Sequence, residues 1–244
     1  MELFKEGGIE MLARYGHIIS GITWIGLLYY FNFAQTPAFA SFEAPARNEA
    51  FAKLVPRAMW WFRWAAMSTL VFGILLFGLY SGGDNKPYDP MSGMPVVGIL
   101  TGIFFALIMF CNVWFVIWPA QRRAIANGQN LLAGGEADAG LPPIMRRAAT
   151  ASRTNTFLSI PMLFWMVAAA HLILLNPAHW SDTGAHRGIW YLIVLLVGIV
   201  AEGIALKAPP VGSGLSKHLD DHKVTIASGF ALAAVLYLLF EAVF

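Results

Sequence analysis

The sequence of 244 residues contains a single cysteine, Cys111. One cysteine excludes an internal disulfide, a zinc site built on several thiolates and an iron–sulfur cluster, since each of these needs more than one thiol. It also excludes a covalently attached c-type haem, because the C-x-x-C-H attachment motif contains two cysteines. Any cofactor that the chain binds must therefore be held by other side chains.

Charged residues are also scarce. Asp, Glu, Lys and Arg make up 12% of the chain, about half the share of an ordinary soluble domain, whereas hydrophobic residues make up 58%. The formal net charge of +2 argues against a nucleic-acid partner, which calls for a strongly basic surface. The composition predicts an all-α, polytopic membrane protein whose main partner is the lipid bilayer.

Long charge-free runs mark the predicted membrane spans, since about 20 apolar residues in a helix cross the bilayer core. Four runs contain no charged residue, and two more are interrupted only by Glu202 and Glu241 near their ends. Turn sequences such as Ala208-Pro209-Pro210 separate the runs. We predict a single membrane domain with six transmembrane helices, at approximately residues 12–35, 60–81, 95–118, 157–176, 188–206 and 224–243.

The distribution of Lys and Arg predicts the orientation in the membrane. These residues concentrate in the loops after the first, third and fifth predicted helices, whereas the loops after the second and fourth hold only Lys86 and Arg187. Positively charged loops stay on the cytoplasmic side. We therefore expect both termini outside, which in a bacterium means a multi-pass inner-membrane protein with periplasmic ends.

Two histidines fall inside predicted spans, where an ionisable side chain is costly and needs a reason. His17 lies about a third of the way along the first helix, and His171 lies about five residues before the end of the fourth. The predicted topology puts both in the outer half of the membrane, with His179 and His186 in the following outer loop. Because neutral imidazole is a common haem ligand, His17 and His171 are candidate axial ligands of a b-type haem, with His179 and His186 in reserve.

The helix face that carries His17 also carries Gly21 and Trp24, at spacings of four and seven residues. A glycine one turn from a histidine allows a flat macrocycle to approach closely, so Gly21 and Trp24 are candidate cofactor-binding residues. The alternative is that each histidine donates one hydrogen bond to a neighbouring helix and that Gly21 and Trp24 are ordinary packing residues. The sequence alone leaves both interpretations open.

Other polar residues are weaker candidates. Glu202 lies near the inner end of the fifth predicted helix, where it either relays protons or reaches the interface, and Asn112 lies in the middle of the third. The segment 218–222 contains two histidines and two aspartates with a spacing that suits metal ligands. Because it falls in a predicted inner loop, a solvated polar segment is the simpler interpretation.

Four segments, in order along the first four predicted helices, share a family pattern. They run over 16–37, which contains His17, Gly21 and Trp24, and over 61–66, 112–123 and 153–171. Together they resemble the urate oxidase N-terminal family, the membrane domain of PuuD-type bacterial urate hydroxylases. The resemblance implies a membrane redox protein in which urate oxidation delivers electrons to a cytochrome c. Because the chain ends after the sixth predicted helix, the expected cytochrome c is a separate periplasmic partner.

Three functions follow as hypotheses. The first is a b-type haem electron-transfer protein, an oxidoreductase similar to urate hydroxylase. The second is a non-catalytic accessory subunit of a larger membrane respiratory or oxygenase complex. The third is a protein that handles copper or another metal through His17, His171, His179 and His186. A urate pocket needs convergent polar groups, and the residues available for one are Asn32, Gln35, Asn112 and Asn155.

Overall fold

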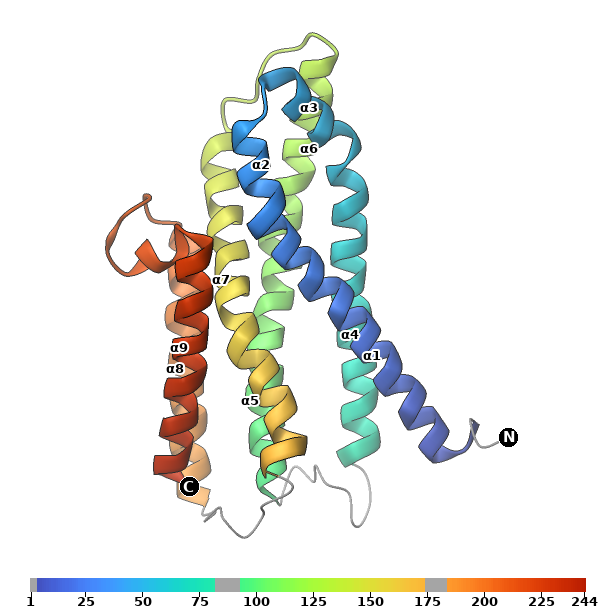
Figure 1. The fold of residues 1–244 in the computed structure, drawn as a ribbon, viewed down its shortest axis with the longest axis vertical. Helices are drawn as coiled ribbons and strands as arrows, with labels where there is room; N and C mark the ends of the chain where they lie inside the picture. The colour runs from blue at the N-terminus through green and yellow to red at the C-terminus, as the bar shows by residue number, and fades with distance from the viewer. Residues whose placement is uncertain (1–3, 82–92, 174–183) are drawn as a thin grey trace.

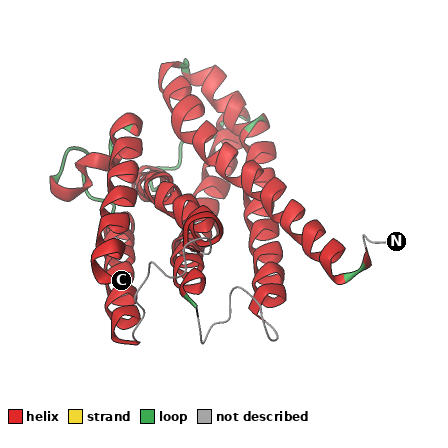
Figure 2. Ribbon diagram, turned by 60° about the horizontal axis from the view of Figure 1, so that its bottom comes forward, coloured by secondary structure: helices red, strands yellow, loops and turns green. Residues whose placement is uncertain are grey.

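The structure, a computed structural model, describes residues 4–81, 93–173 and 184–244. Within these ranges the chain is helical and has no strand (Figure 2), so the all-α prediction is confirmed. The elements in order are α1 (Glu6–Tyr30), η2 (Phe31–Gln35), α2 (Thr36–Ser41), α3 (Ala44–Lys53), α4 (Val55–Ser81), α5 (Met94–Cys111), η3 (Asn112–Ile117), α6 (Trp118–Leu132), α7 (Leu141–Ala168), η4 (Ala169–Ile173), α8 (Gly184–Lys207), η6 (Gly214–Leu219) and α9 (His222–Val243).

Five helical segments are long and apolar enough to cross a membrane, and they correspond to the second to sixth predicted spans. The chain is therefore a multi-pass membrane protein. The first predicted span also forms a continuous helix, from α1 through η2 to α2, but it is not among the five. Its first turns contain Glu10 and Arg14, and His17 and Asn32 follow, so polar residues interrupt its apolar stretch.

The predicted spans leave residues 119–156 as the longest connection, but most of these residues are helical in the structure. The helix that begins at α5 continues through η3 and α6 to Leu132, and α7 already begins at Leu141. These polar extensions stay helical because they pack on other helices: a Cβ at Gly128 of α6 would lie 3.0 Å from Phe51 Cβ of α3. Only residues 133–140 connect the two helices. The prediction failed because helices do not end where their apolar stretch ends.

The helices form two groups, which Figure 1 shows side by side. The first is the pair of α1 and α4, which pack along each other. The second is a bundle of α5, α7, α8 and α9, in which α7 contacts each of the other three. The pair and the bundle meet near η2 and near α3 and α6, and α1 diverges from α7 toward the end that carries both termini. Which side of the membrane this end faces stays a prediction.

The bundle has an aromatic core at the crossing of α7, α8 and α9. Trp165, Trp190 and Phe240 are buried, and the three ring centroids are 4.9 to 5.2 Å apart. Such edge-on aromatic contacts add to the energy of apolar burial. About three turns before Phe240 on α9, a Cβ at Gly229 would lie 2.9 Å from the backbone oxygen of Phe157. The backbones of α7 and α9 therefore approach too closely there for any side chain.

Candidate functional site

His17 lies on α1 and turns its imidazole toward α4. Its Nδ1 is 2.9 Å from the backbone oxygen of Thr69, and because a carbonyl oxygen can only accept, Nδ1 is the donor. In the neutral ring, Nε2 is then the basic nitrogen, and it makes no hydrogen bond to any described residue. An Nδ1–H bond to a backbone carbonyl is the arrangement that orients a metal-binding histidine.

The predicted face of Gly21 and Trp24 also points at α4. A Cβ at Gly21 would lie 4.0 Å from Thr69 Cγ2, and a Cβ at Gly73 of α4 would lie 3.1 Å from His17 Cε1. The helix that approaches this face is therefore α4, which matches the packing interpretation. Trp24 is buried and its Nε1 has no partner in the described part of the chain. Two nitrogens of this face, on His17 and Trp24, thus remain available to a ligand.

The other candidate histidines lie outside the α1–α4 pair. His171 is exposed and belongs to the π-helical turn η4 at the end of α7. His186 lies in the first turn of α8, with its ring centroid 6.1 Å from that of Phe244. His179 falls outside the described residues. No hydrogen bond joins His17 to His171, and the described residues contain no cluster of three His, Cys, Asp or Glu side chains that suits a metal ion.

His17 and His171 nevertheless lie in the same half of the molecule, the half nearest the termini. Tyr29 Oη lies 2.8 Å from Ser159 Oγ where α1 meets α7. Beyond this contact the helices diverge, so Ile22 of α1 is 64% exposed and Val167 of α7 is 57% exposed. His171 follows Val167 by one turn on the same side of its helix. In this half of the molecule, α1 and α7 thus each present exposed apolar side chains.

A polar network occupies the half of the bundle nearest α3 and α6. The Asn112 Nδ2 group donates to Asn155 Oδ1 at 3.0 Å and to Glu202 Oε2 at 2.9 Å. Asn155 Nδ2 in turn donates to the backbone oxygen of Met109 at 2.9 Å. Asn112 and Asn155 are fully buried, so this network ties α5, η3, α7 and α8 together. A carboxyl group held by a neutral amide in an apolar setting is suited to take up and release a proton.

Each of the π-helical turns η2, η3 and η4 carries at least one of the polar residues singled out from the sequence. Asn32 and Gln35 lie in η2, Asn112 lies in η3 and His171 lies in η4. A π-helical turn accommodates one extra residue, which rotates the side chains that follow it, and such turns are frequent at functional sites. In η2, the Asn32 Nδ2 group donates to the Ser152 hydroxyl of α7 at 2.8 Å.

Several buried polar atoms in the same half have no hydrogen-bond partner among the described residues. They include Oε1 of Gln35, Oδ1 of Asn112, Nε1 of Trp114 and Oε1 of Gln121. An unsatisfied polar group away from water costs about 1–3 kcal/mol. Bound water or a polar ligand would satisfy such atoms, so these residues of η2, η3 and α6 extend the candidate site.

Arg63 borders this polar region. Its guanidinium carbon lies 4.0 Å from the ring centroid of Trp118 and 5.8 Å from those of Trp64 and Trp114. A cation over an aromatic face is stabilised by the negative potential of the ring. Arg63 and these aromatic residues therefore form a packed contact between α4 and the helix of η3 and α6.

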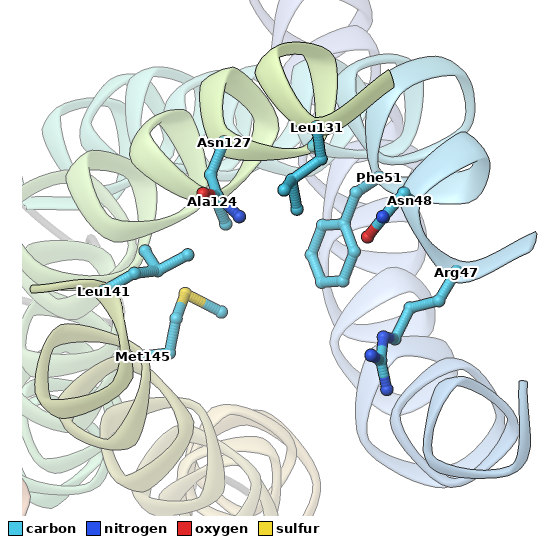
Figure 3. A pocket seen from close by; sticks show the side chains of 9 residues that line it. Arg47, Asn48, Phe51, Ala124, Asn127, Leu131, Leu141 and Met145 are labelled. Carbon is cyan, nitrogen blue, oxygen red and sulfur yellow. The ribbon is translucent and has the colours of Figure 1, made fainter. Parts of the chain in front are cut away.

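Two cavities lie beside these elements. The smaller, of about 220 Å³, lies between α3, α6 and α7, and Figure 3 shows Phe51, Leu131 and Met145 turned toward it. Its polar lining residues are Arg47, Asn48 and Asn127, and Asn127 Oδ1 accepts from the backbone N–H of Asp138. The larger, of about 440 Å³, lies between α7, α8, α9 and η6.

Sequence reasoning named Asn112 and Glu202 separately and missed that they are bonded. The sequence signal that could have indicated the bond is that Asn112 and Glu202 are each an isolated polar residue in an apolar run. The proposed metal ligands of segment 218–222 are used otherwise: Asp220 binds Arg146 and Asp221 caps α9. The rings of His218 and His222 pack on Phe157 and Phe33.

Comparison with known proteins supports the resemblance seen in the sequence. Residues 95–207 match the family model described as urate oxidase N-terminal. The match runs from α5 to α8, so it contains the Asn112–Asn155–Glu202 network and His171 but not His17. No curated protein and no solved structure matches the chain. Residues 95–207 of the chain are thus similar in sequence to the urate oxidase N-terminal family.

Proposed function

We propose that the protein is an electron-transfer protein of the bacterial inner membrane, with a b-type haem held by His17 and His171, that passes electrons to a periplasmic cytochrome c. The observation that carries the proposal is the orientation of His17. The Thr69 carbonyl holds the Nδ1–H group, which leaves the basic Nε2 for an iron atom. The family match adds redox chemistry as the context, and its name suggests urate as the source of electrons.

The described residues suit a haem in the chemistry of their donors and in their surroundings. A haem iron takes neutral imidazole nitrogens, and its macrocycle needs apolar walls. Ile22 of α1 and Val167 of α7 present such side chains in the half of the molecule that carries the two histidines. When bound, the haem would supply a one-electron redox centre. The chain itself orients His17 through Thr69 and lowers the dielectric around the iron by excluding water.

The test is a reduced-minus-oxidised absorption spectrum of the purified full-length chain, with a pyridine haemochrome assay on the same sample. We expect a b-type spectrum at about one haem per chain, and its loss in His17→Ala and in His171→Ala. The matched control is His222→Ala, because His222 packs on Phe33 at the opposite end of the molecule. A flat spectrum of well-folded native protein, or full haem content in both variants, would contradict the proposal.

If only His17→Ala loses haem, the second ligand moves to the reserve residues, and His179→Ala and His186→Ala identify it. Elemental analysis of the same samples tests for copper. If the histidines bind copper, the copper content should fall in His17→Ala and in His171→Ala. Either result changes the ligand set and is read from the same preparations.

An accessory subunit is the second candidate function. The exposed apolar faces of α1 and α7 favour it, since a partner helix could cover them. This function predicts a flat spectrum together with a larger complex that co-purifies from native membranes. Deletion of the partner would then reduce the amount of this chain in the membrane.

A further inference from the structure

The larger cavity of about 440 Å³ carries a separate inference. Its walls are α7, α8 and α9, and η6 closes one end. Leu196 and Val200 of α8 line it and are 52% and 56% exposed, so the cavity borders the region that lipid occupies. Cavities of this size hold small ligands, with a few polar groups that set their orientation.

One buried hydroxyl lines this cavity without a partner. Thr154 is 1% exposed, and its Oγ1 makes no hydrogen bond to any described residue. The other buried threonines behave differently, since each donates its hydroxyl to the carbonyl four residues earlier in the chain; they are Thr69, Thr101, Thr150, Thr156 and Thr225. The Thr154 hydroxyl is therefore the one that remains available to a ligand.

The second polar group of the cavity is the imidazole of His218 in η6. Its ring centroid lies 5.2 Å from that of Phe157, one turn after Thr154 on α7, so the two polar groups lie at the same end of the cavity. The Thr225 hydroxyl bonds to the His218 carbonyl at 2.8 Å and holds this residue in place. His218 is thus fixed by its backbone, and its ring lines the cavity.

The loop that carries His218 is fastened to α7. Arg146 donates to the Pro209 carbonyl, at 2.7 Å from Nη2, and to Asp220 Oδ1 at 3.1 Å. The second carboxylate oxygen of Asp220 accepts from the backbone N–H of Gly212. These bonds hold residues 209–220 in place at the end of the cavity that His218 and Leu219 line.

The cavity is polar at the loop end and apolar toward the middle of the membrane, where Val197 and Leu232 line it. This polarity matches an amphiphile oriented as a membrane lipid is. The described lining contains no Lys or Arg, and Arg146, outside the lining, is paired with Asp220, so a phosphate head group finds no cation in this lining. A neutral carbonyl head group, in contrast, accepts hydrogen bonds from a hydroxyl and an imidazole.

We propose that this cavity binds the ring of a membrane quinone, with Thr154 and His218 bonded to its carbonyl oxygens and the isoprenoid tail directed between α8 and α9. The proposal does not depend on the haem, since it concerns binding at residues that the haem proposal does not use. It names a lipid-soluble redox partner for the half of the molecule opposite His17.

The test is calorimetric titration of the purified full-length chain with decylubiquinone. We expect saturable binding at one site per chain and an affinity at least about tenfold weaker in Thr154→Val, which loses one hydrogen bond without changing shape. Thr150→Val is the matched control, because Thr150 lies one turn earlier and its hydroxyl is bonded to the Arg146 carbonyl. It should bind like the wild type.

A second variant and a second ligand keep the test decisive. His218→Phe preserves ring packing on Phe157 and should also weaken binding about tenfold. Decylbenzene, which has a ring and tail but no carbonyl, should not compete. The proposal is overturned by absent or unsaturable binding, by equal affinity in Thr154→Val and Thr150→Val, or by equal competition from decylbenzene. Haem content, measured in parallel, is expected to be the same in all these variants.

Discussion

The α1–α4 pair and the α5–α7–α8–α9 bundle are built in different ways. The bundle has a buried aromatic core around Trp165 and a polar network that ties its helices through Asn112, Asn155 and Glu202. The pair is joined to the bundle by few side-chain bonds, such as those of Tyr29 and Asn32 to α7, and its α1 helix exposes apolar side chains such as Ile22. The bundle is the part that the family match covers.

The difference teaches how the two kinds of site arise. In an apolar medium, hydrophobic burial does not drive one helix onto another, and packing with hydrogen bonds does so instead. The bundle uses such bonds to fix α5, α7 and α8 in one arrangement. The pair leaves the half of α1 that carries His17 separated from α7, which suits a site that a cofactor or partner completes.

Breaking the network of the bundle should have the largest effect. Asn155→Leu removes one acceptor of the Asn112 amide and the side-chain donor to the Met109 carbonyl. We expect a loss of about 1–3 kcal/mol in the free energy of unfolding, because both hydrogen bonds are deeply buried. Thermal unfolding in detergent measures it. Gln129→Leu, at an exposed position of α6, is the control, and an equal loss in both variants would contradict the role of the network.

Loosening the joint between pair and bundle should have an intermediate effect. Tyr29→Phe with Ser152→Ala removes one partner from each of the two bonds of α1 to α7, worth about 0.5–1.5 kcal/mol each. With Cys111 replaced by Ser, spin labels at Ile22 and Leu163 report the distance between α1 and α7. We expect a broader distance distribution than in the labelled parent.

The control for the joint is Thr23→Val, since the Thr23 hydroxyl bonds only within α1, to the Ile19 carbonyl. It should leave the distance distribution unchanged. If the variant at the joint also keeps the parent distribution, the divergence of α1 from α7 is set by packing on α4 alone.

We expect the smallest effect from a change at the N-terminal caps of the helices, which differ between α9 of the bundle and α1 of the pair. Asp221 caps α9 through its carboxylate, whereas Lys5 at the start of α1 makes no capping bond. The backbone N–H of Val224, followed by that of Lys223, lowers the pKa of Asp221. A carboxyl group whose folded-state pKa is lowered stabilises the protein at neutral pH, and this contribution is lost as the pH falls through that pKa.

We therefore expect Asp221→Ala to lower the thermal midpoint at pH 7, with a difference from the wild type that shrinks below about pH 4. Asp221→Asn keeps a capping oxygen and should stay close to the wild type at pH 7. Circular dichroism at several pH values measures both variants. A difference that is constant from pH 7 to pH 3 would show that the charge of Asp221 has no part in the cap.

Much of the fold could be predicted from the sequence. Charge-free runs marked the five apolar spans because lipid tolerates few charges in a membrane helix. The length of the helices could not be predicted in the same way. α6 and the start of α7 are polar, and they pack on each other while α6 also packs on α3, which no local pattern announces.

Some residues of the candidate site could likewise be predicted from the sequence, and others could not. His17 and His171 stood out because each is an ionisable residue in an apolar run, and their role as haem ligands stays a prediction. The network of Asn112, Asn155 and Glu202 did not stand out, since its members are 43 to 90 residues apart in the chain. Three-dimensional packing alone reveals such a set.

By itself, the sequence determined that this chain crosses a membrane several times, because its composition leaves few charged residues for a water-exposed surface. It also determined which residues are unusual in such helices. Only the tertiary structure decided what these residues do. It turned Nδ1 of His17 to the Thr69 carbonyl, joined Asn112 to Glu202 and left the Thr154 hydroxyl alone beside a cavity. The physical reason is that a hydrogen bond depends on distance and direction between helices, which neighbouring residues in the sequence do not specify.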